Sequence, residues 1–488
     1  MSPTSADAGS RRRWLILAII GVAQLMVVLD ATIVNIALPS AQQDLGFSDD
    51  SRQWIVTAYA LSFGSLLLLG GRLGDLFGRR RVFVAGLAGF AGASALGGFA
   101  PGFGVLVGAR ALQGAFAALL APAALSLLTT TFTLPDERNR AFSVFGVIGA
   151  SGAALGLILG GALTELLDWR WTMFVNLILA VPTAALALRL LTDDTAQASR
   201  SRMDLPGTLA ASAGLFTLVY GFSSAETNGW GSALTLAGLA TGVALLAAFV
   251  AVERRVEHPL LPLRVVADKA RAGGYLSIGV VGAGMFGVFL FLTYYLQQTL
   301  DFSPLVSGLA FLPMMAIIMP VGAIGQTRLL PRFGPRPLVA VGMVLSAAAM
   351  LMFARVGVGS SYATDVLPGL LVLGAGLGLV FGTAMDTAVR GVEGADAGVA
   401  SALVNTGQQV GGSIGTALLS TLAASASGAY ASAHRAAADV AAQSAVHGYT
   451  AAFTWAAGIF AVGSIAAWLL LPSEAPDVSA DAEPVFAH

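Results

Sequence analysis

The sequence predicts an all-α integral membrane protein with 14 transmembrane helices, arranged as two six-helix pseudo-repeated bundles plus two inserted helices. The first observation is composition, because 56% of the residues are hydrophobic and only 11% are charged, whereas a soluble protein carries about 25% charged residues. The second is a series of long apolar runs, and the third is a pattern shared by the two halves. The chain has no cysteine, which excludes disulfides and thiol chemistry, and no basic domain that would indicate nucleic-acid binding.

Each predicted span is an apolar run near the ~20 residues that cross a bilayer, with enough glycine or alanine for close helix packing. The first run follows Arg11, Arg12 and Arg13, as in a secretory signal, but it continues through Leu38 without an obvious cleavage site. We therefore expect a retained helix. The spans lie near residues 14–38, 54–73, 82–100, 104–132, 141–166, 171–191, 205–223, 231–252, 272–298, 305–326, 336–356, 364–388, 397–424 and 450–471.

The basic residues indicate which loops face the cytoplasm. With the N-terminus inside, the outer side holds only Arg52, Arg170, Arg355 and Arg435, and Arg110 alone lies well inside a span rather than at its end. The other 21 of the 26 Lys and Arg lie on the inner side, as expected from the excess of positive charge in cytoplasmic loops. We expect both termini in the cytoplasm and the protein in the inner (cytoplasmic) membrane of the cell.

This order of spans divides the chain into two bundles, an insertion and short polar segments. Within the second bundle, an Ala/Ser-rich outer loop at about 424–450 is either a short surface helix or a disordered loop. The expected segments are a cytoplasmic tail (1–13), the N-terminal bundle (14–191), a cytoplasmic connector (192–204), the inserted spans (205–252), the C-terminal bundle (272–471) and a cytoplasmic tail (472–488).

Two matches support the internal repeat, and both fit one offset that pairs spans 1–6 with spans 9–14. Phe77-Gly78 after span 2 matches Phe333-Gly334 after span 10, although Pro331 replaces the acidic residue of the first half. Glycines also recur at intervals of four in spans 5 and 13. Because small residues let helices approach closely, we expect both rows to flank the interface between the halves, and the span-5 glycines are candidates for conformational gating. The rows are Gly152, Gly156 and Gly160, with Gly161 beside them, and Gly407, Gly411 and Gly415.

A charged turn between spans 2 and 3 is a candidate for conformational gating, in which Asp75 would act as a latch that holds the outward-facing state through an arginine of a neighbouring cytoplasmic loop. It contains Gly71, Asp75, Gly78, Arg79 and Arg80. Glycine permits close approach and positive φ, the carboxylate can cap a helix or pair with an arginine, and the cationic cluster holds the turn in the cytoplasm. An ordinary cytoplasmic turn is the simpler interpretation.

Asp30, about two-thirds of the way through span 1, is the leading candidate for a proton carrier. A carboxylate at that depth is costly, so it is normally protonated, paired or in a water-filled cavity. Arg110, early in span 4, cannot lose its proton, and Asp30 is the acidic residue deep in the same half. The pair is either a proton-coupling site or a fixed structural contact, and Arg110 could instead bond to backbone carbonyls.

Five neutral amides are candidate residues of a substrate cavity. A neutral amide that faces a cavity can bond to a substrate, or it can bond to a neighbouring helix, and the sequence leaves both interpretations open. These residues are Asn35, Gln113, Asn405, Gln408 and Gln409.

Several of these motifs resemble the major facilitator superfamily, over about residues 14–471. The charged turn between spans 2 and 3 resembles the signature loop of the superfamily. Arg110-x-x-Gln113-Gly114 resembles the superfamily's span-4 motif, whose arginine is implicated in proton transfer. The span-1 motif is similar to that of the fourteen-span drug:proton antiporter branch. Three further segments read like that branch. The motifs are Gly71-x-Leu73-x-Asp75-x-x-Gly78-Arg79-Arg80, Leu29-Asp30-x-Thr32-Ile33-Val34-Asn35, Trp169-Arg170-Trp171-x-x-Phe174-x-Asn176, Tyr295-Leu296-Gln297-Gln298 and Gly407-Gln408-Gln409-Val410-Gly411-Gly412.

The chain departs from the family pattern in two places. Leu157 stands where the span-5 antiporter motif has proline after glycine, and Asn405 and Gln408 stand in span 13, where exporters of dications often carry acids. The resemblance implies proton-coupled efflux of hydrophobic or amphiphilic small molecules, such as antibiotics, driven by the proton-motive force without a cofactor or metal. We expect a monomer in contact with lipids, substrates that are neutral, anionic or monocationic, and no enzymatic activity. The alternatives are an exporter or importer of a single metabolite and, remotely, a membrane sensor or scaffold.

Overall fold

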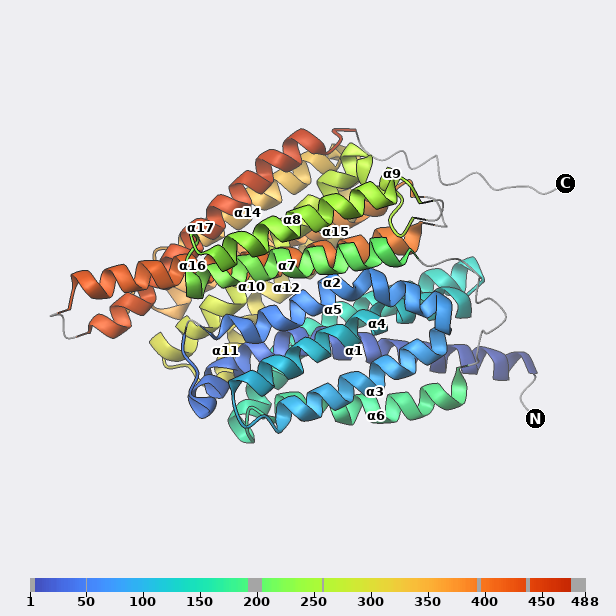
Figure 1. Ribbon diagram of the computed structural model, residues 1–488, viewed down its shortest axis with the longest axis horizontal. Helices are drawn as coiled ribbons and strands as arrows, with labels where there is room; N and C mark the ends of the chain where they lie inside the picture. The colour runs from blue at the N-terminus through green and yellow to red at the C-terminus, as the bar shows by residue number, and fades with distance from the viewer. Residues whose placement is uncertain are drawn as a thin grey trace.

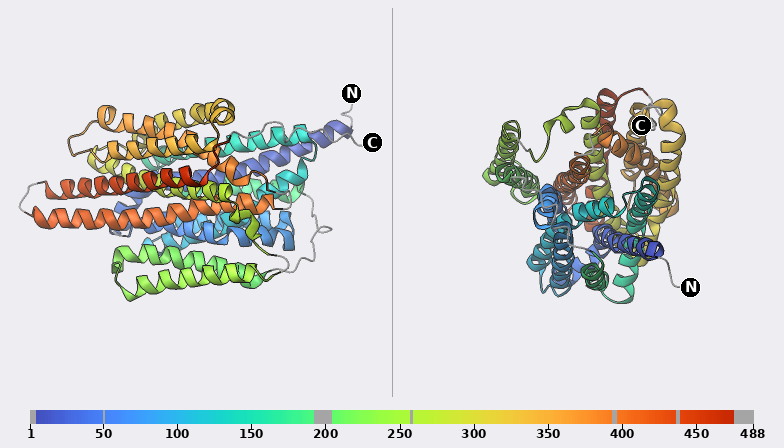
Figure 2. Two further views of the ribbon diagram at one scale, coloured as in Figure 1. Left: turned by 90° about the horizontal axis from the view of Figure 1, so that it is seen from above. Right: turned by 90° about the vertical axis from the view of Figure 1, so that its right-hand side faces the viewer.

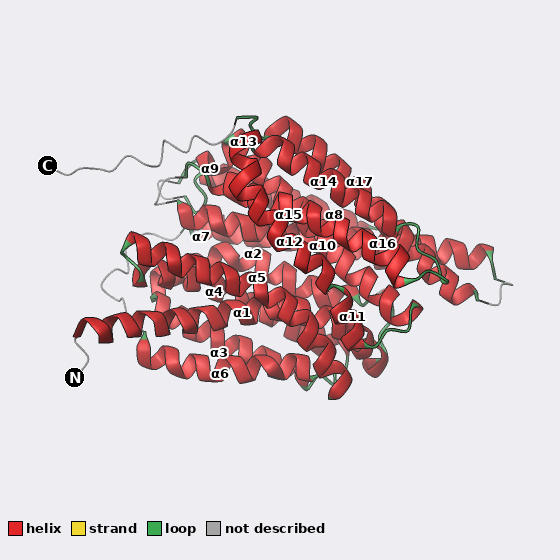
Figure 3. Ribbon diagram, turned by 180° about the vertical axis from the view of Figure 1, so that it is seen from behind, coloured by secondary structure: helices red, strands yellow, loops and turns green. Residues whose placement is uncertain are grey.

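The protein is a bundle of helices that run along one long axis (Figure 1). The computed structural model describes residues 5–49, 51–191, 204–256, 259–392, 396–435 and 439–474, and these ranges contain no strand (Figure 3). Thirteen helices of the described ranges are long and apolar enough to cross a membrane. Such helices suit lipid because their backbone hydrogen bonds are satisfied within the segment. The remaining predicted span, span 13 at 397–424, falls on a helix that is rich in Gly, Ser and Gln.

The first six helices form the N-terminal half, as predicted. α1 begins at Ser5, so most of the expected N-terminal tail continues the first helix. The six helices are α1 (Ser5–Leu45), α2 (Gln53–Phe77), α3 (Arg79–Gly98), α4 (Phe103–Thr131), α5 (Pro135–Leu166) and α6 (Trp171–Leu190).

The two inserted helices form a hairpin beside the bundle, α7 (Leu205–Asn228) and α8 (Ala233–Glu253). Figure 2 shows this pair at the edge of the molecule. α7 packs against α2 of the first half and α16 of the second, and Leu68, Ala211 and Ala400 share one apolar cluster with α8. The connector predicted at 192–204 lies outside the described residues, apart from Asp204. The Asp204 carboxylate accepts a hydrogen bond from the Gly207 backbone and caps α7.

The second half contains the six remaining predicted spans, some of them interrupted. Span 10 is divided into three helices, with a π-helical turn at Gly325–Leu329, and π-helical turns also occur at Tyr295–Thr299 and Tyr362–Val366. The elements are α9 (Leu263–Ala267), α10 (Lys269–Tyr294), α11 (Pro304–Ala310), α12 (Leu312–Ile324), α13 (Leu330–Phe333), α14 (Pro335–Phe353), α15 (Leu367–Val389), α16 (Ala397–Ala433) and α17 (Val440–Leu470).

Both ends of the described chain lie at one end of the bundle (Figure 1). We call this the terminal end and the opposite one the far end. At the far end, α16 and α17 project beyond the other helices as a hairpin (Figure 1). Of the two alternatives for the expected outer loop at 424–450, the structure has helix in the described residues rather than a disordered loop. These residues continue α16 and α17, and their many alanines support the extension because Ala has the highest helix propensity. Residues 475–488 of the expected C-terminal tail lie outside the described residues.

The two turns matched in the sequence have the same backbone geometry. Gly78 ends α2 with φ of 91°, and Gly334 ends α13 with φ of 72°. A residue with a side chain is strained at these angles, which explains the glycine at both positions. The repeat is thus visible at the level of single dihedral angles.

The glycine rows do not flank the interface between the halves, which corrects our expectation. In α5, a Cβ added at Gly156 would meet Thr32 and Leu29 of α1, and Gly160 lies against Ile33. In α16, the equivalent glycines lie against α10 of the same half, where Gly411 contacts Gly279. Each row thus lets two helices approach within one half, and the sequence pattern did not reveal which neighbour each row faces.

Candidate functional site

Asp30 and Arg110 meet in the interior of the N-terminal half. The Arg110 Nη1 group donates to the Asp30 Oδ2 atom at 2.5 Å, and the two residues are 1% and 0% exposed, respectively. The guanidinium is also held by the Ile55 carbonyl, which accepts from Nε at 3.2 Å. The sequence left open whether Arg110 pairs with a carboxylate or bonds to backbone carbonyls. In the structure it does both.

Two amides complete the surroundings of the carboxylate. Gln113 Nε2 donates to Asp30 Oδ1 at 2.9 Å, and Asn176 Nδ2 donates to the same oxygen at 2.7 Å. The Ser94 hydroxyl oxygen accepts from both amides, at 2.6 and 3.1 Å. α1, α3, α4 and α6 thus each contribute to one closed polar cluster, which we call the Asp30 cluster (Asp30, Ser94, Arg110, Gln113 and Asn176).

An aromatic ring covers the cation of this cluster. The Arg110 Cζ atom lies 4.4 Å from the centroid of the Tyr59 ring, and the Tyr59 hydroxyl donates to the Val27 carbonyl at 3.3 Å. A buried ion pair repays its desolvation only with good geometry and further hydrogen bonds, and here three donors and a ring supply them. This arrangement stabilises the ionised pair, and it leaves no face of the carboxylate open to water.

Sequence reasoning found three members of the cluster and missed two. Asp30, Arg110 and Gln113 were singled out, whereas Ser94 was not, and Asn176 appeared only within a motif of the resemblance. Nothing in the sequence places a serine of span 3 near Asp30, because its two hydrogen-bond partners come from two other helices, α4 and α6. Gln113 is also corrected as a cavity residue, since its amide is buried and bonded within the cluster.

The four remaining amides are not brought to one site. Asn35 bonds to its own helix through the Ala31 carbonyl, and its Oδ1 atom is buried without a partner. Asn405 is exposed and bonds to its own helix. Gln408 lies beside Gly282 through its backbone, while Gln409 lies against Gly64 of the other half. The substrate cavity therefore stays a prediction, supported by the exposed Asn405 rather than by a cluster.

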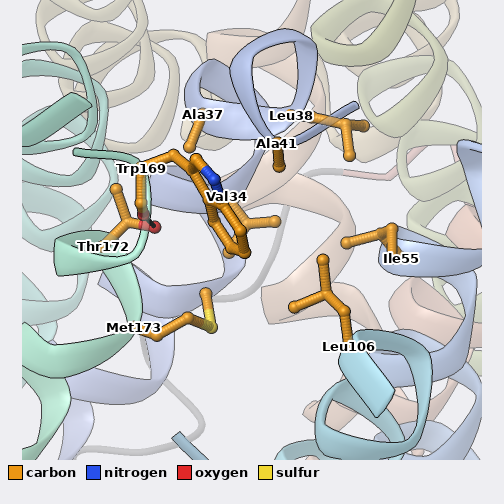
Figure 4. Close-up of a pocket in the computed structure, with 9 residues that line it drawn as sticks. All are labelled: Val34, Ala37, Leu38, Ala41, Ile55, Leu106, Trp169, Thr172 and Met173. Carbon is orange, nitrogen blue, oxygen red and sulfur yellow. Dashed lines mark hydrogen bonds between the residues drawn. The ribbon is translucent and has the colours of Figure 1, made fainter. Parts of the chain in front are cut away.

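A small cavity lies between α1, α2, α4 and the start of α6 (Figure 4). Its volume of about 10 Å³ is that of one water at most. A drug-sized ligand needs a pocket of several hundred Å³, so this cavity is not the substrate site. It is lined by Val34, Ala37, Leu38, Ala41, Ile55, Leu106, Trp169, Thr172 and Met173.

The candidate gating loop is tied to two distant segments. Arg72 donates to the Pro259 carbonyl beyond the inserted hairpin at 2.9 Å, and Arg80 donates to the Leu188 carbonyl of α6 at 2.6 Å. Gly71 faces Pro122 of α4, and Arg79 is half-buried. The side chain of Asp75 lies outside the described residues, so its role as a latch stays a prediction.

The halves are joined at the far end by contacts that the sequence did not predict. Arg52 precedes α2 and is 8% exposed. Its Cζ atom lies 4.0 Å from the centroid of the Tyr294 ring and 5.7 Å from that of Tyr449, both in the second half. We call these residues, with Phe291 at 6.0 Å, the Arg52 cage. In the sequence Arg52 was only one of four outer arginines.

Hydrogen bonds continue this closure around the far end. The Tyr294 hydroxyl donates to Gln42 at 2.5 Å, and Gln297 donates to the Ile36 carbonyl at 2.9 Å. On the other side, Glu165 accepts from the Leu305 backbone at 3.0 Å, and Gly161 lies against Leu305. Of the α5 glycines predicted to gate, Gly161 is thus the one that touches the opposite half.

The Major Facilitator Superfamily model matches residues 20–416 of the chain. The chain is 49% identical to the puromycin resistance protein pur8 of Streptomyces alboniger, over 96% of this chain and 94% of that protein. It is 37% identical to the tetracenomycin C resistance and export protein of Streptomyces glaucescens, over 85% of this chain and 77% of that protein. It is 32% identical to the multidrug efflux pump LfrA of Mycolicibacterium smegmatis, over 84% and 80%.

Solved structures agree on the fold. An auto-inhibited POT family peptide transporter superposes with a TM-score of 0.67 at 16% identity, covering 94% of this chain and 96% of that one. A bacterial homologue of the lysosomal transporter Spinster, in an inward-facing conformation, gives a TM-score of 0.66 at 14% identity, covering 94% and 97%. At such low identity these similarities concern the architecture alone.

Proposed function

The chain belongs to the Major Facilitator Superfamily, and we propose that it is an antiporter that exports hydrophobic or amphiphilic small molecules in exchange for protons. Membership makes it a multi-pass membrane transporter rather than an enzyme. The direction of transport, the coupling ion and the orientation in the membrane belong to the proposal.

The observation that carries the proposal is the Asp30 cluster. A carboxylate buried at membrane depth beside a permanent cation is costly to maintain, and such residues mark proton relays in membrane transporters. The carboxylate can exist with or without a proton, whereas Arg110 keeps its charge. Protonation of Asp30 therefore leaves Arg110 uncompensated and changes the balance of forces between α1 and α4.

The names of the relatives support export of antibiotic-like compounds. They include resistance to puromycin and lincomycin and export of cephamycin and tetracenomycin C. Asn405 and Gln408 place neutral amides in span 13, where exporters of dications in this family often carry acidic residues. We therefore propose neutral, anionic or monocationic amphiphiles as substrates.

The proposed cycle alternates access by rocking of the two halves. With the termini in the cytoplasm, the far end faces outward, and the Arg52 cage closes that side in the present conformation. Ionised Asp30 accompanies capture of substrate from the cytoplasm or inner leaflet, and protonation from outside accompanies release. A membrane potential of 100 mV contributes roughly 2.3 kcal/mol per charge, which sustains a gradient of about fiftyfold for one proton. We propose that a monomer in the cytoplasmic membrane is sufficient.

A second candidate function is export of one specific compound. It is favoured by the names of several relatives, because each of these names mentions a single antibiotic. The two candidates share the Asp30 cluster and differ in the breadth of substrates.

Purified protein in proteoliposomes tests both candidates. An imposed proton gradient should drive accumulation of several chemically distinct amphiphiles in the wild type, and Asp30→Asn should abolish it. Accumulation of one compound alone would favour the specific exporter. Accumulation that persists in Asp30→Asn would exclude Asp30 as the coupling residue, and robust transport of a dication such as chlorhexidine would contradict the proposed substrate class.

A further inference from the structure

Asn176 of α6 has one feature that the proposed cycle does not use. Its Nδ2 group donates both to Asp30 Oδ1 at 2.7 Å and to the Ser94 hydroxyl oxygen at 3.1 Å. Its own carbonyl oxygen, Oδ1, is buried and has no hydrogen-bond partner, and the residue is 0% exposed. An orphaned buried carbonyl costs free energy, so its presence next to Asp30 calls for a physical reason.

The other carbonyl of the Asp30 cluster is already occupied. Gln113 Oε1 accepts from Arg110 Nη1 at 2.8 Å. Within the cluster, Asn176 Oδ1 is therefore the side-chain carbonyl that has no donor. The charged or titratable side chains that face Asp30 from the packed helices are Arg110 of α4 and Tyr59 of α2. Arg110 can only donate, and the Tyr59 hydroxyl is engaged with the Val27 carbonyl.

This arrangement suits an ionised carboxylate and opposes a protonated one. Both oxygens of Asp30 face N–H groups, from Arg110 at Oδ2 and from the two amides at Oδ1. A bound proton turns one of these oxygens into a hydroxyl donor, and that hydroxyl would then point at other donors. A buried donor without an acceptor is destabilised. Proton binding therefore requires that an acceptor be supplied.

We propose that Asn176 is a positioning residue whose side-chain amide reverses when Asp30 takes up a proton. This inference rests on the proposed function. The proton adds to Asp30 Oδ1 and converts the carboxylate into a neutral acid. A half-turn about the last side-chain torsion of Asn176 brings its Oδ1 to the place held by Nδ2. That oxygen then accepts from the Asp30 hydroxyl and from the Ser94 hydroxyl. Reversal of the same steps returns the proton to water.

The reversal conserves the number of hydrogen bonds. Before it, Nδ2 donates to Asp30 and Ser94, and after it, Oδ1 accepts from Asp30 and Ser94. Before the reversal the Asn176 carbonyl oxygen is the buried group without a hydrogen-bond partner, and after it the Asn176 amino group is. Ser94 suits this exchange because a hydroxyl both donates and accepts. Asn176 thus keeps two hydrogen bonds, to Asp30 and Ser94, in both protonation states, and α6 senses the protonation of α1.

Infrared difference spectroscopy of the wild type in proteoliposomes tests this inference directly. The chain contains only five asparagines, so labelling their side-chain amides with ¹³C gives few bands. On acidification, we expect one labelled amide band to shift with the same pH midpoint at which an Asp30 carboxylic acid band appears. A labelled spectrum that stays unchanged while the Asp30 band forms would overturn the inference. The measurement needs no variant of Asn176.

Two variants on α6 give a functional readout. Asn176→Leu keeps the shape of the side chain and removes both the donor and the acceptor. Thr183→Val, on the same helix, removes a buried hydroxyl that bonds only to the Leu179 carbonyl. A hydrogen bond to a charged group changes an equilibrium constant by about tenfold to a hundredfold. We therefore expect the rate of drug-driven proton release to fall by that factor in Asn176→Leu. Drug affinity should stay within about twofold, and Thr183→Val should match the wild type.

The failures of the two proposals are distinguishable. If Asp30→Asn abolishes proton release while Asn176→Leu retains it with the wild-type pH profile, the inference about Asn176 is wrong and the antiport proposal stands. If Asp30→Asn itself exchanges drug for protons as the wild type does, antiport stands without Asp30 as its coupling residue, and the inference about Asn176 fails. If the wild type moves drug without any proton exchange, the antiport proposal fails, and the inference fails with it.

Discussion

Removal of the Arg52 side chain should open the far end of the transporter. Arg52 lies between the halves, with its guanidinium 4.0 Å from the Tyr294 ring centroid and further rings at 5.7 and 6.0 Å. Burial opposes the charge on Arg52, but Tyr449, Tyr294 and Asp49 outweigh burial and raise the pKa of Arg52 above its ordinary value. The cation is therefore present at every physiological pH, and the Arg52 cage does not act as a pH switch.

The size of the effect follows from the burial of this cation. A cation over an aromatic ring contributes about 0.5–1 kcal/mol when exposed and about 2 kcal/mol or more when desolvated. The Arg52 side chain is only 9% exposed, and its ionic partner Asp49 is 3.5 Å away and mostly exposed. The rings therefore dominate its contacts. A loss of about 2 kcal/mol changes the ratio of closed to open far ends by about thirtyfold.

Distances between spin labels measure this ratio, and the absence of native cysteine leaves only the introduced labelling sites. Labels at Gln43→Cys and Val306→Cys report on α1 and α11 at the far end. In Arg52→Ala, we expect the long-distance population to rise about thirtyfold relative to the short one. Arg355→Ala, an exposed arginine at the same end, should change nothing. If the two variants give the same distance distribution, the reasoning about the Arg52 cage is refuted.

Three further predictions concern packing, coupling and the gating loop. Gly156→Ala should lower the melting temperature in detergent, because its methyl group meets Thr32 at an overpacking cost of about 1–3 kcal/mol. Gly146→Ala, with open space around it, should raise it slightly, and equal shifts would contradict the packing argument. Arg110→Lys should lower coupled transport at least about tenfold, because an ammonium cannot reproduce the planar fork; wild-type proton exchange would contradict this. Asp75→Asn should slow turnover with drug affinity retained, whereas unchanged turnover would exclude the latch.

The sequence was sufficient for the architecture because the bilayer constrains it strongly. Apolar length, the distribution of arginines and one offset between halves predicted the six-plus-two-plus-six order of the helices. The match of Gly78 with Gly334 extended to positive φ at both residues. These features depend on local sequence and on lipid, so a single chain reveals them.

Features that depend on which helices face each other were beyond the sequence. The periodicity of Gly156 and its neighbours shows a flat face but not its partner, so the row was placed at the wrong interface. Ser94 is an ordinary serine until α3 packs against α4 and α6. Arg52 carries no signal as a loop arginine, because its aromatic partners lie more than 200 residues away. Pairing of distant segments, rather than local propensity, decided each of these cases.

The most direct test of proton-coupled export is whether a drug gradient alone moves protons uphill. Proteoliposomes with equal pH on both sides would receive an amphiphilic drug on one side, and the internal pH would be recorded. The account predicts that drug entry drives proton movement in the opposite direction in the wild type and none in Asp30→Asn. Drug entry without any proton movement in the wild type would contradict antiport.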